Sequence, residues 1–505
     1  PAGLTYRENA EKNAATKGEG KVALDTKAKG STKIITTALA ASANLSSKGV
    51  GGAGAAAVSV LQNTMAARIE KSTIAADTLN NIASSDALLI NTAGGMAVGG
   101  GYFSGAGSVS VQYTSDTTKA ELEDSDVEAQ HTAVQAKTKN VDVNVAGQVS
   151  AGQNGAGLAV AFNHMNNATQ AQILGTSIKG AAHEVAVAAE NNSTTVSVAA
   201  GVGLGSSWAL AGALAINQGK DTTQAGIGAS ESKRSSLENV NRSAVDAKDS
   251  TTKVAVAGGL SAAGTAAVGG AIAYNQVGGV GYQSTEAFLN NTDILTKGDK
   301  SALRVHALDE ATLGTAAAGI GGAGSVAVQG AGATSNIEKN VRTQMAGTNV
   351  KSAAGAPKAA LSLKAESTGS MYTNTLVLAG SGTVAVGAGV SVTTALGSTT
   401  AELSGGQQEV GGAEVRAASK NKVLTVGVGG AGAGTAAVAG SVAVNVQKGE
   451  TTAKITDGAQ LDAAHDVVVA ATSDRAVDTY AGVLSAAGVG AAAGLSSVVN
   501  TIKTT

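Results

Sequence analysis

The sequence predicts an all-β fold, a repetitive parallel β-helix (β-solenoid). A cassette recurs from one end of the chain to the other: Ala-x-Ile/Leu, two residues, Ser/Thr, one residue and a β-branched residue. It reads Ala67-Arg68-Ile69, then Ser72 and Ile74. Its copies are about 55 residues apart on average. A fixed period of this kind indicates a stacked array in which each repeat contacts its neighbours.

The Ala and the aliphatic residue of each cassette are the repeat anchors, and we expect them to hold structural positions. The weaker copies begin at Ala225, Thr343, Ala401 and Ala453. The anchor residues are Ala67, Ile69, Ala120, Leu122, Ala171, Ile173, Ala225, Ile227, Ala287, Leu289, Ala401, Leu403, Ala453 and Ile455.

Composition supports a narrow interior. The 505 residues include 68 Gly and 2 Pro, with 2% aromatic and 14% charged residues. Aromatic and leucine side chains supply most of the buried area in an ordinary globular core, and this chain has few of them. We therefore expect an interior filled by Ala, Val, Ile and Gly.

Within a repeat, a short alternating strand follows the cassette after about ten residues, as at Val185 to Ala188, and a Gly/Ala-rich stretch comes next, as at Val423 to Asn445. Alternation with period two and β-branched residues indicates strands, and this density of Gly opposes helix. Because Gly lets backbones approach closely, Gly/Ala faces are expected to pack across a flattened coil or between molecules.

The repeat length is compatible with two coils of about 27 residues or with three of about 18, the size of a left-handed triangular helix. We expect two coils and a right-handed helix, because the short-repeat pattern of the triangular form is not visible. Some 18 coils stacked at about 4.8 Å would make a rod about 90 Å long.

An asparagine closes the Gly/Ala stretch in several repeats. These residues either form a stacked side-chain ladder at a corner of the coil or simply end a strand. They are Asn163, Asn217, Asn275 and Asn445.

The domain organisation expected is a single continuous solenoid over residues 1–505, with about nine repeats, cut from a longer chain. Two polar insertions interrupt the period, near residues 230–253 and 336–358. Insertions in solenoids usually emerge as loops on one face.

Several function classes are disfavoured. A net charge of −2 and a pI near 6.3 give no electrostatic basis for binding nucleic acid. Uncharged stretches such as Leu424 to Val446 are long enough to span a membrane, but their Gly content and alternation favour strands. The chain has no cysteine, and its glycines lack the phosphate-loop pattern. We therefore expect no cofactor and no membrane-spanning segment.

Catalysis is not expected either. The five histidines lack metal-ligand spacing, and we place His183 and His465 at matching solvent-facing corners. Glycoside hydrolysis needs two carboxylates facing a groove, and the sugar-binding aromatic residues are missing. The single tryptophan, Trp208, lies in a Gly/Ala stretch and is expected to pack or to mark an exposed contact. The chain is thus predicted to be no enzyme, with no metal site.

The order of these parts resembles the repeats of bacterial large exoproteins, which include filamentous-haemagglutinin-like adhesins and leukotoxin-type filamentous adhesins. Residues 159–178 and 441–455 carry the resemblance best, and it covers nearly the whole chain. It implies a β-helical rod, export by a type V secretion route, and an extracellular or outer-surface location. It brings neither a receptor nor catalytic residues.

These features together predict a structural β-solenoid shaft of a secreted or surface-displayed bacterial adhesin or fibre, which mediates attachment or filament formation. Self-association, end to end or lateral, fits open strand edges and Gly/Ala faces. The host-cell or bacterial receptor is not specified. The alternatives are a segment of a secreted leukotoxin-like toxin and a polysaccharide-acting β-helix enzyme.

Overall fold

The computed structural model describes residues 23–46, 48–180, 183–231, 233–297 and 301–504, and every helix or strand found there is a β-strand. The strands are β1 (Ala23–Asn44), β2 (Val50–Glu70), β3 (Thr73–Ala75), β4 (Thr78–Gly99), β5 (Phe103–Glu123), β6 (Asp126–Glu128), β7 (His131–Leu174), β8 (Ser177–Lys179), β9 (His183–Gly219), β10 (Thr222–Gly228), β11 (Ser235–Ala263), β12 (Ala266–Asn290), β13 (Thr292–Thr296), β14 (Ala302–Ala323), β15 (Val326–Ala346), β16 (Asn349–Ser352), β17 (Ala359–Ser381), β18 (Val384–Ser404), β19 (Gln407–Ala433), β20 (Ala436–Thr456), β21 (Gln460–Ala463), β22 (Val467–Ala487) and β23 (Ala491–Thr504).

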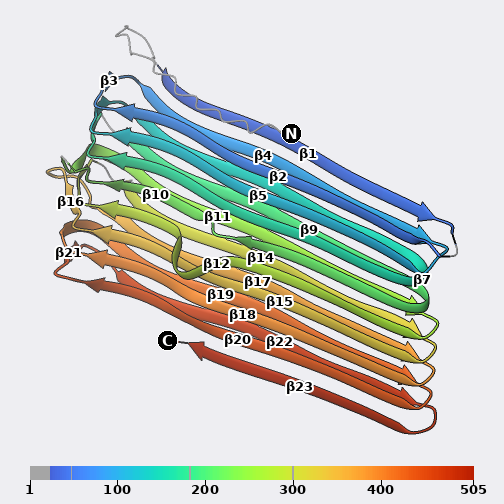
Figure 1. Ribbon diagram of the computed structural model, residues 1–505. Helices are drawn as coiled ribbons and strands as arrows, with labels where there is room; N and C mark the ends of the chain where they lie inside the picture. The colour runs from blue at the N-terminus through green and yellow to red at the C-terminus, as the bar shows by residue number, and fades with distance from the viewer. Residues whose placement is uncertain (1–22, 47, 181–182, 232, 298–300, 505) are drawn as a thin grey trace.

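Each coil of the solenoid contains a long outbound strand, a tight turn, a long return strand and a short closing strand. In one coil these are β14, β15 and β16, and β14 pairs in parallel with β17, its equivalent in the next coil. The coils stack in sequence order from β1 to β23 (Figure 1). The fold is therefore a β-solenoid, as predicted. The strand assignments of β7 and β9 run through the tight turn, so each of these strands belongs to both layers.

The expected division of each repeat into two coils is wrong. Parallel partners are Ala23 with Thr78 and Val245 with Val305, so neighbouring strands lie a whole repeat apart. The alternating strand joins the first half of the Gly/Ala stretch in one long strand, such as β14 with 22 residues. The tight turn divides the stretch itself, as between Ala433 and Ala436. The described residues thus form nine coils.

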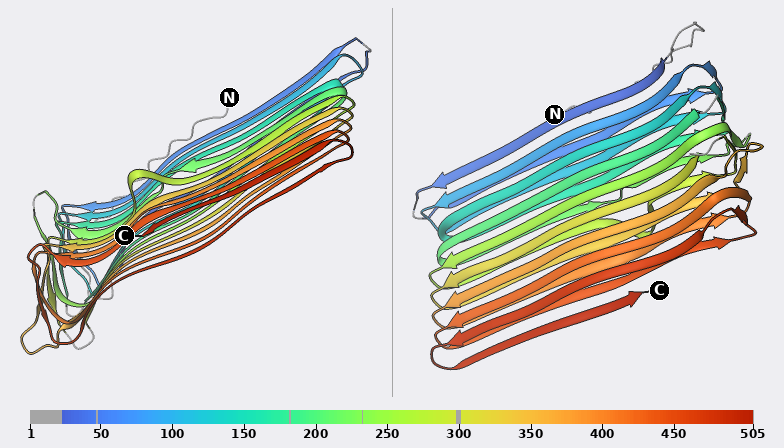
Figure 2. Two further views of the ribbon diagram at one scale, coloured as in Figure 1. Left: turned by 90° about the horizontal axis from the view of Figure 1, so that it is seen from below. Right: turned by 180° about the vertical axis from the view of Figure 1, so that it is seen from behind.

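The shape is a flat plate and not the expected rod. Nine coils at about 4.8 Å span roughly 40 Å, and a strand of some 21 residues spans about 70 Å. Seen along its edge, the plate is thin where the tight turns lie and wider where the short strands lie (Figure 2). We call the thin half the blade, which in β14 and β15 comprises residues 314–334 and in other coils their equivalents. The other half is the base.

The base has a conventional aliphatic core. The anchors lie here on adjacent strands, for example Ala120 beside Ala171 and Leu122 beside Ile173, and they belong to the largest cluster of buried apolar residues. A corner with positive φ follows most of the anchor pairs, as at Asp124 (φ 47°). The Ser72 amide then donates to Ser125 Oγ of the next coil at 3.1 Å. The Ser/Thr of the cassette thus satisfies backbone groups at the corner.

The blade has an interior of very small residues. A Cβ added to Gly201 would lie 2.2 Å from the Gly212 carbonyl oxygen of the facing layer. Where one layer carries a larger residue, the other carries glycine, since a Cβ at Gly157 would lie 1.9 Å from the side chain of Gln148. The two layers are therefore closer than facing side chains would allow. The Gly/Ala faces pack across a flattened coil, one of the two arrangements expected.

The polar insertions are mostly strand and not loops, which corrects the expectation. Residues 235–253 belong to β11, and residues 336–352 lie largely in β15 and β16. Within the two insertions, the described residues that lie outside strands are those near 229–234 and 353–358. Register shifts near Val240 accommodate part of the extra length. In the described part of the chain no helix could span a membrane.

Candidate interaction surface and buried polar seam

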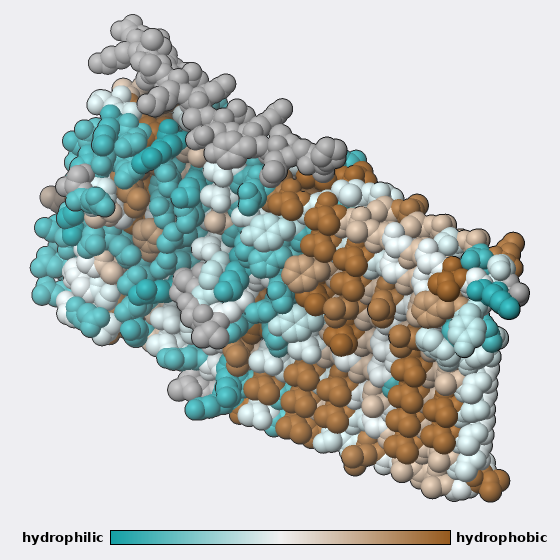
Figure 3. Space-filling view, viewed as in Figure 1, coloured by the Kyte–Doolittle hydropathy of each residue, from teal (hydrophilic) through white to brown (hydrophobic). Residues whose placement is uncertain are grey.

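Large apolar side chains project from the outer faces of the blade. Because side chains alternate along a strand, and the strands pair in register, outward residues form rows across the coils. Apolar residues gather over the half with the tight turns, and polar residues over the base (Figure 3). The outbound layer presents the row Met96, Val149, Val202, Leu260, Ile320 and Leu378.

The return layer presents a comparable row on the opposite face. Ile272 is 55% exposed and Val109 is 42% exposed, so these side chains are only half covered. The row consists of Val109, Val160, Leu214, Ile272, Gly332 and Val390.

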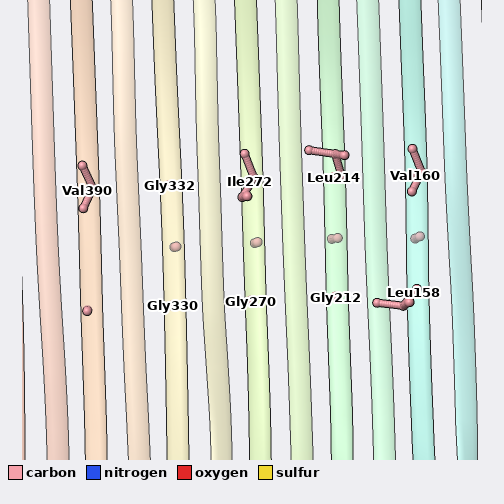
Figure 4. Close-up of a pocket in the computed structure, with 14 residues that line it drawn as sticks. Leu158, Val160, Gly212, Leu214, Gly270, Ile272, Gly330, Gly332 and Val390 are labelled. Atoms are coloured by element: carbon pink, nitrogen blue, oxygen red, sulfur yellow. The ribbon is translucent and has the colours of Figure 1, made fainter.

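A groove floored by glycine runs beside each row. On the return face Gly212, Gly270 and Gly330 form the floor, with Leu214 and Ile272 along one side (Figure 4). This groove encloses about 660 Å³. On the outbound face a groove of about 550 Å³ includes Gly94 and Gly147 among its lining residues. Both faces therefore carry an aliphatic ridge parallel to a groove of small residues over part of the stack. Leu158 closes the return groove at one end, and Leu376 and Val428 fill the outbound groove in later coils.

Almost all described charged groups on the outer faces lie on the base. The exceptions are Asp478, at the edge of the blade nearest the base, and Lys48 in the tight turn between β1 and β2. On the outbound face, the four outward rows nearest the tight turns begin at Thr37, Leu39, Ala41 and Ala43, and none of their described residues is charged. On the base, ion pairs connect successive coils: Lys137 with Glu190 at 2.9 Å and Lys364 with Glu414 at 3.0 Å are two examples. The base is thus well hydrated, and the blade offers water an apolar surface.

The size of each blade face is unusual for a monomeric protein. Four outward rows over nine coils cover roughly 26 by 40 Å, or about 1,000 Å². The largest apolar patch on a typical monomer is about 300 to 600 Å². Patches beyond that size indicate a contact site.

A polar seam fills the interior between base and blade. Three predicted asparagines are adjacent rungs there: Asn163 Nδ2 donates to Asn217 Oδ1 at 3.2 Å, and Asn217 Nδ2 donates to Asn275 Oδ1 at 2.8 Å. Asn445 stands in the same row but is separated from them by Ser335 and Thr393. The row is buried in mid-strand and not at a corner, because the strand continues past it toward the base.

Buried charges that were not predicted from the sequence occupy the same seam. Lys339 Nζ contacts a carboxylate oxygen of Asp309, and Asp249 Oδ1 lies 3.3 Å from it. Lys253 is fully buried, and its Nζ has no hydrogen-bond partner. Asp142 accepts a hydrogen bond from Thr114 at 2.7 Å. Their burial could have been predicted from the alternation of side chains, because each lies an even number of residues from inward-facing apolar residues of its strand.

Burial dominates the ionisation of this seam. It raises the pKa of Asp142 to about 7 and that of Asp116 to about 6. Burial lowers the pKa of Lys253. Burial also opposes the charged form of Lys339, but Asp309 and Asp249 outweigh it and hold its pKa above the ordinary value. The seam thus contains both an ion-paired lysine, Lys339, and a buried lysine without a hydrogen-bond partner, Lys253.

The remaining sequence-predicted positions fall as follows. The anchors from Ala67 to Leu403 are buried, and Ala453 and Ile455 are partly buried against the same cluster. His183 is fully buried, so its predicted solvent-facing corner is wrong, and burial lowers its pKa to about 4. Trp208 is 40% exposed and its ring centroid lies 6.0 Å from that of Phe103.

Among the described residues, no group of three or more His, Cys, Asp or Glu could hold a metal ion. Comparison with protein-family models, with curated proteins and with solved structures gave no match for this chain.

Proposed function

We propose that the chain is a structural β-solenoid segment of a secreted or surface-displayed bacterial adhesin or fibre, mediating attachment or filament formation. The observation that carries this proposal is the pair of apolar faces on the blade, which carry no charge in the described residues of the outward rows nearest the tight turns. The resemblance of the repeats to those of large exoproteins supports the bacterial and extracellular part of it.

The architecture suits such a role physically. Parallel ladders fix every outward side chain in a row, so the contact surface is rigid and loses little conformational entropy on binding. The charged base keeps the plate in water, while the apolar faces supply the driving force for contact. Repetition extends both properties over the whole length of the stack.

The test is an adhesion assay with beads coated with the purified chain, alongside electron microscopy without added ligand. We expect beads to adhere to host or bacterial cells, or the protein to form filaments. Gly258→Glu combined with Gly332→Glu should abolish either result, since both glycines face outward with no atom within 4 Å of an added Cβ. Thr252→Glu, on the base side of β11, is the matched control.

Other outcomes would contradict the proposal. Lysis of host cells without adhesion would favour a toxin segment. Release of sugar ends from polysaccharides would favour an enzyme. Neither adhesion nor filaments would remove the structural role as stated.

A further inference from the structure

We infer that the partner of each blade face is a second copy of this chain, packed face to face over the apolar rows. This inference deepens the proposed structural role and depends on it. The occupant is identified by three observations: the relief of the faces, their area and their lack of charge.

The relief of the two faces is matched. On the return face the ridge containing Leu214 and Ile272 lies two residues along the strand from the groove of Gly212 and Gly270, about 7 Å away. On the outbound face Leu260 stands in the ridge and Gly258 in the groove of the same strand. Ridge and groove are therefore at the same spacing on both faces.

The rungs of each row are also spaced regularly. Strands in any copy of this chain repeat at about 4.8 Å, so a row from one copy remains in step with a groove of another over the several coils that the groove spans. Dry interfaces between paired sheets of small and β-branched residues are built in this way. A partner of unrelated sequence would have to reproduce that periodicity, and a second copy has it already.

The area is sufficient. A stable protein interface buries about 800 Å² on each partner, and the four uncharged rows of a blade face offer about 1,000 Å² on the strand spacings. The outward residues in the four rows nearest the turns are uncharged where described, so no ionic group must be desolvated when two faces meet. A face-to-face pair could therefore close without an uncompensated buried charge.

A lipid surface is the main competing occupant. Hydrocarbon chains in a bilayer have no fixed surface shape, so they would not match the regular spacing of ridge and groove. Binding to lipid in place of self-association would overturn the inference.

The test is sedimentation velocity on the whole chain, with the fluorescence of Trp208 as a second readout. Trp208 is the single tryptophan and lies half exposed on the return face. We expect the mass of the wild type to rise with concentration and the Trp208 emission to shift to shorter wavelength. The variants are Gly258→Glu on the outbound face and Gly332→Glu on the return face.

The double variant should be monomeric, with association weakened at least about 100-fold, because a buried unpaired carboxylate is costly. Single variants that stop at dimers indicate like-to-like contacts, and single variants that are monomeric indicate contacts between unlike faces; both support the inference. Thr252→Glu should associate as the wild type does. Far-ultraviolet circular dichroism confirms that each variant keeps its strand content.

Three results would overturn the inference. The first is that the wild type remains monomeric up to about 100 μM, and the second is that the double variant associates as the wild type does. The third is that the wild type is monomeric and floats with phosphatidylcholine vesicles, whereas the double variant does not. Failure here is separable from failure of the proposed function. A monomer whose beads still adhere to cells loses only the inference, whereas dimers without adhesion or filaments lose the proposed function.

Discussion

The base and the blade are made by the same strands, yet they distribute apolar residues in opposite ways. In β17, Leu361 points into the base and is 2% exposed, whereas Leu378 points out of the blade and is 44% exposed. The base has aliphatic residues inside and charges outside. The blade has Gly and Ala inside and aliphatic residues outside. Burial therefore stabilises the base, and the apolar surface of the blade is left for contacts.

The largest effect expected from this comparison comes from removing equivalent leucines. Leu361→Ala should lower the free energy of unfolding by about 3 kcal/mol, because it leaves a cavity in the aliphatic core. Leu378→Ala, on the same strand, should cost less than about 1 kcal/mol when the protein is monomeric. Urea unfolding at low protein concentration measures both. Equal losses would show that the blade exterior is part of the folding core.

A second comparison sets the inside of the blade against its outside at adjacent residues. A Cβ at Gly259 would lie 2.5 Å from the Gly270 carbonyl oxygen, whereas a Cβ at Gly258 would meet nothing within 4 Å. We expect Gly259→Ala to destabilise the fold by about 2 kcal/mol through overpacking. Gly258→Ala should be neutral or slightly stabilising. Thermal unfolding of the two variants measures the difference. If Gly259→Ala is as stable as the wild type, the two layers can move apart to accommodate the added methyl group.

The third comparison concerns the seam between the halves, where the expected effect depends on pH and is confined to the higher pH values. The pKa of Asp142 is about 7 in the fold, against an ordinary value of 3.8. Between these values the folded chain retains a proton that the unfolded chain releases, so the free energy of unfolding falls as pH rises from about 4 to 7. The groups facing Asp142 are Lys253, Asp221 and Asp116.

Asp142→Asn should remove that part of the slope and stabilise the protein by about 2 kcal/mol at pH 8. The gain is below the full value of the pKa shift because Lys253 loses a favourable charge. Chemical denaturation at pH 5 and pH 8 measures it. If the free energy of unfolding of Asp142→Asn depends on pH as that of the wild type does, another group of the seam causes the dependence. The same measurement on Asp309→Asn would then test that carboxylate.

Much of the fold could be predicted because its signals are local. The cassette predicted the anchors, and its Ser/Thr lies at a corner where backbone groups need a partner. Alternation with period two predicted strands at Val185 and at Val423. The number of coils per repeat was mispredicted, because a register of one repeat or half a repeat leaves the same local pattern.

The sequence by itself determined that the chain repeats, that it is all strand, and which residues recur at equivalent positions, since period and alternation are properties of the chain alone. Only the tertiary structure decided which set of alternating residues faces inward. In β11 the inward phase set by Val245 in the base continues without interruption through Lys253 to Gly259. Hydrophobicity alone would have placed Val256 and Leu260 inside. Continuous strand pairing prevents that reversal, buries Lys253 and leaves the apolar rows outside.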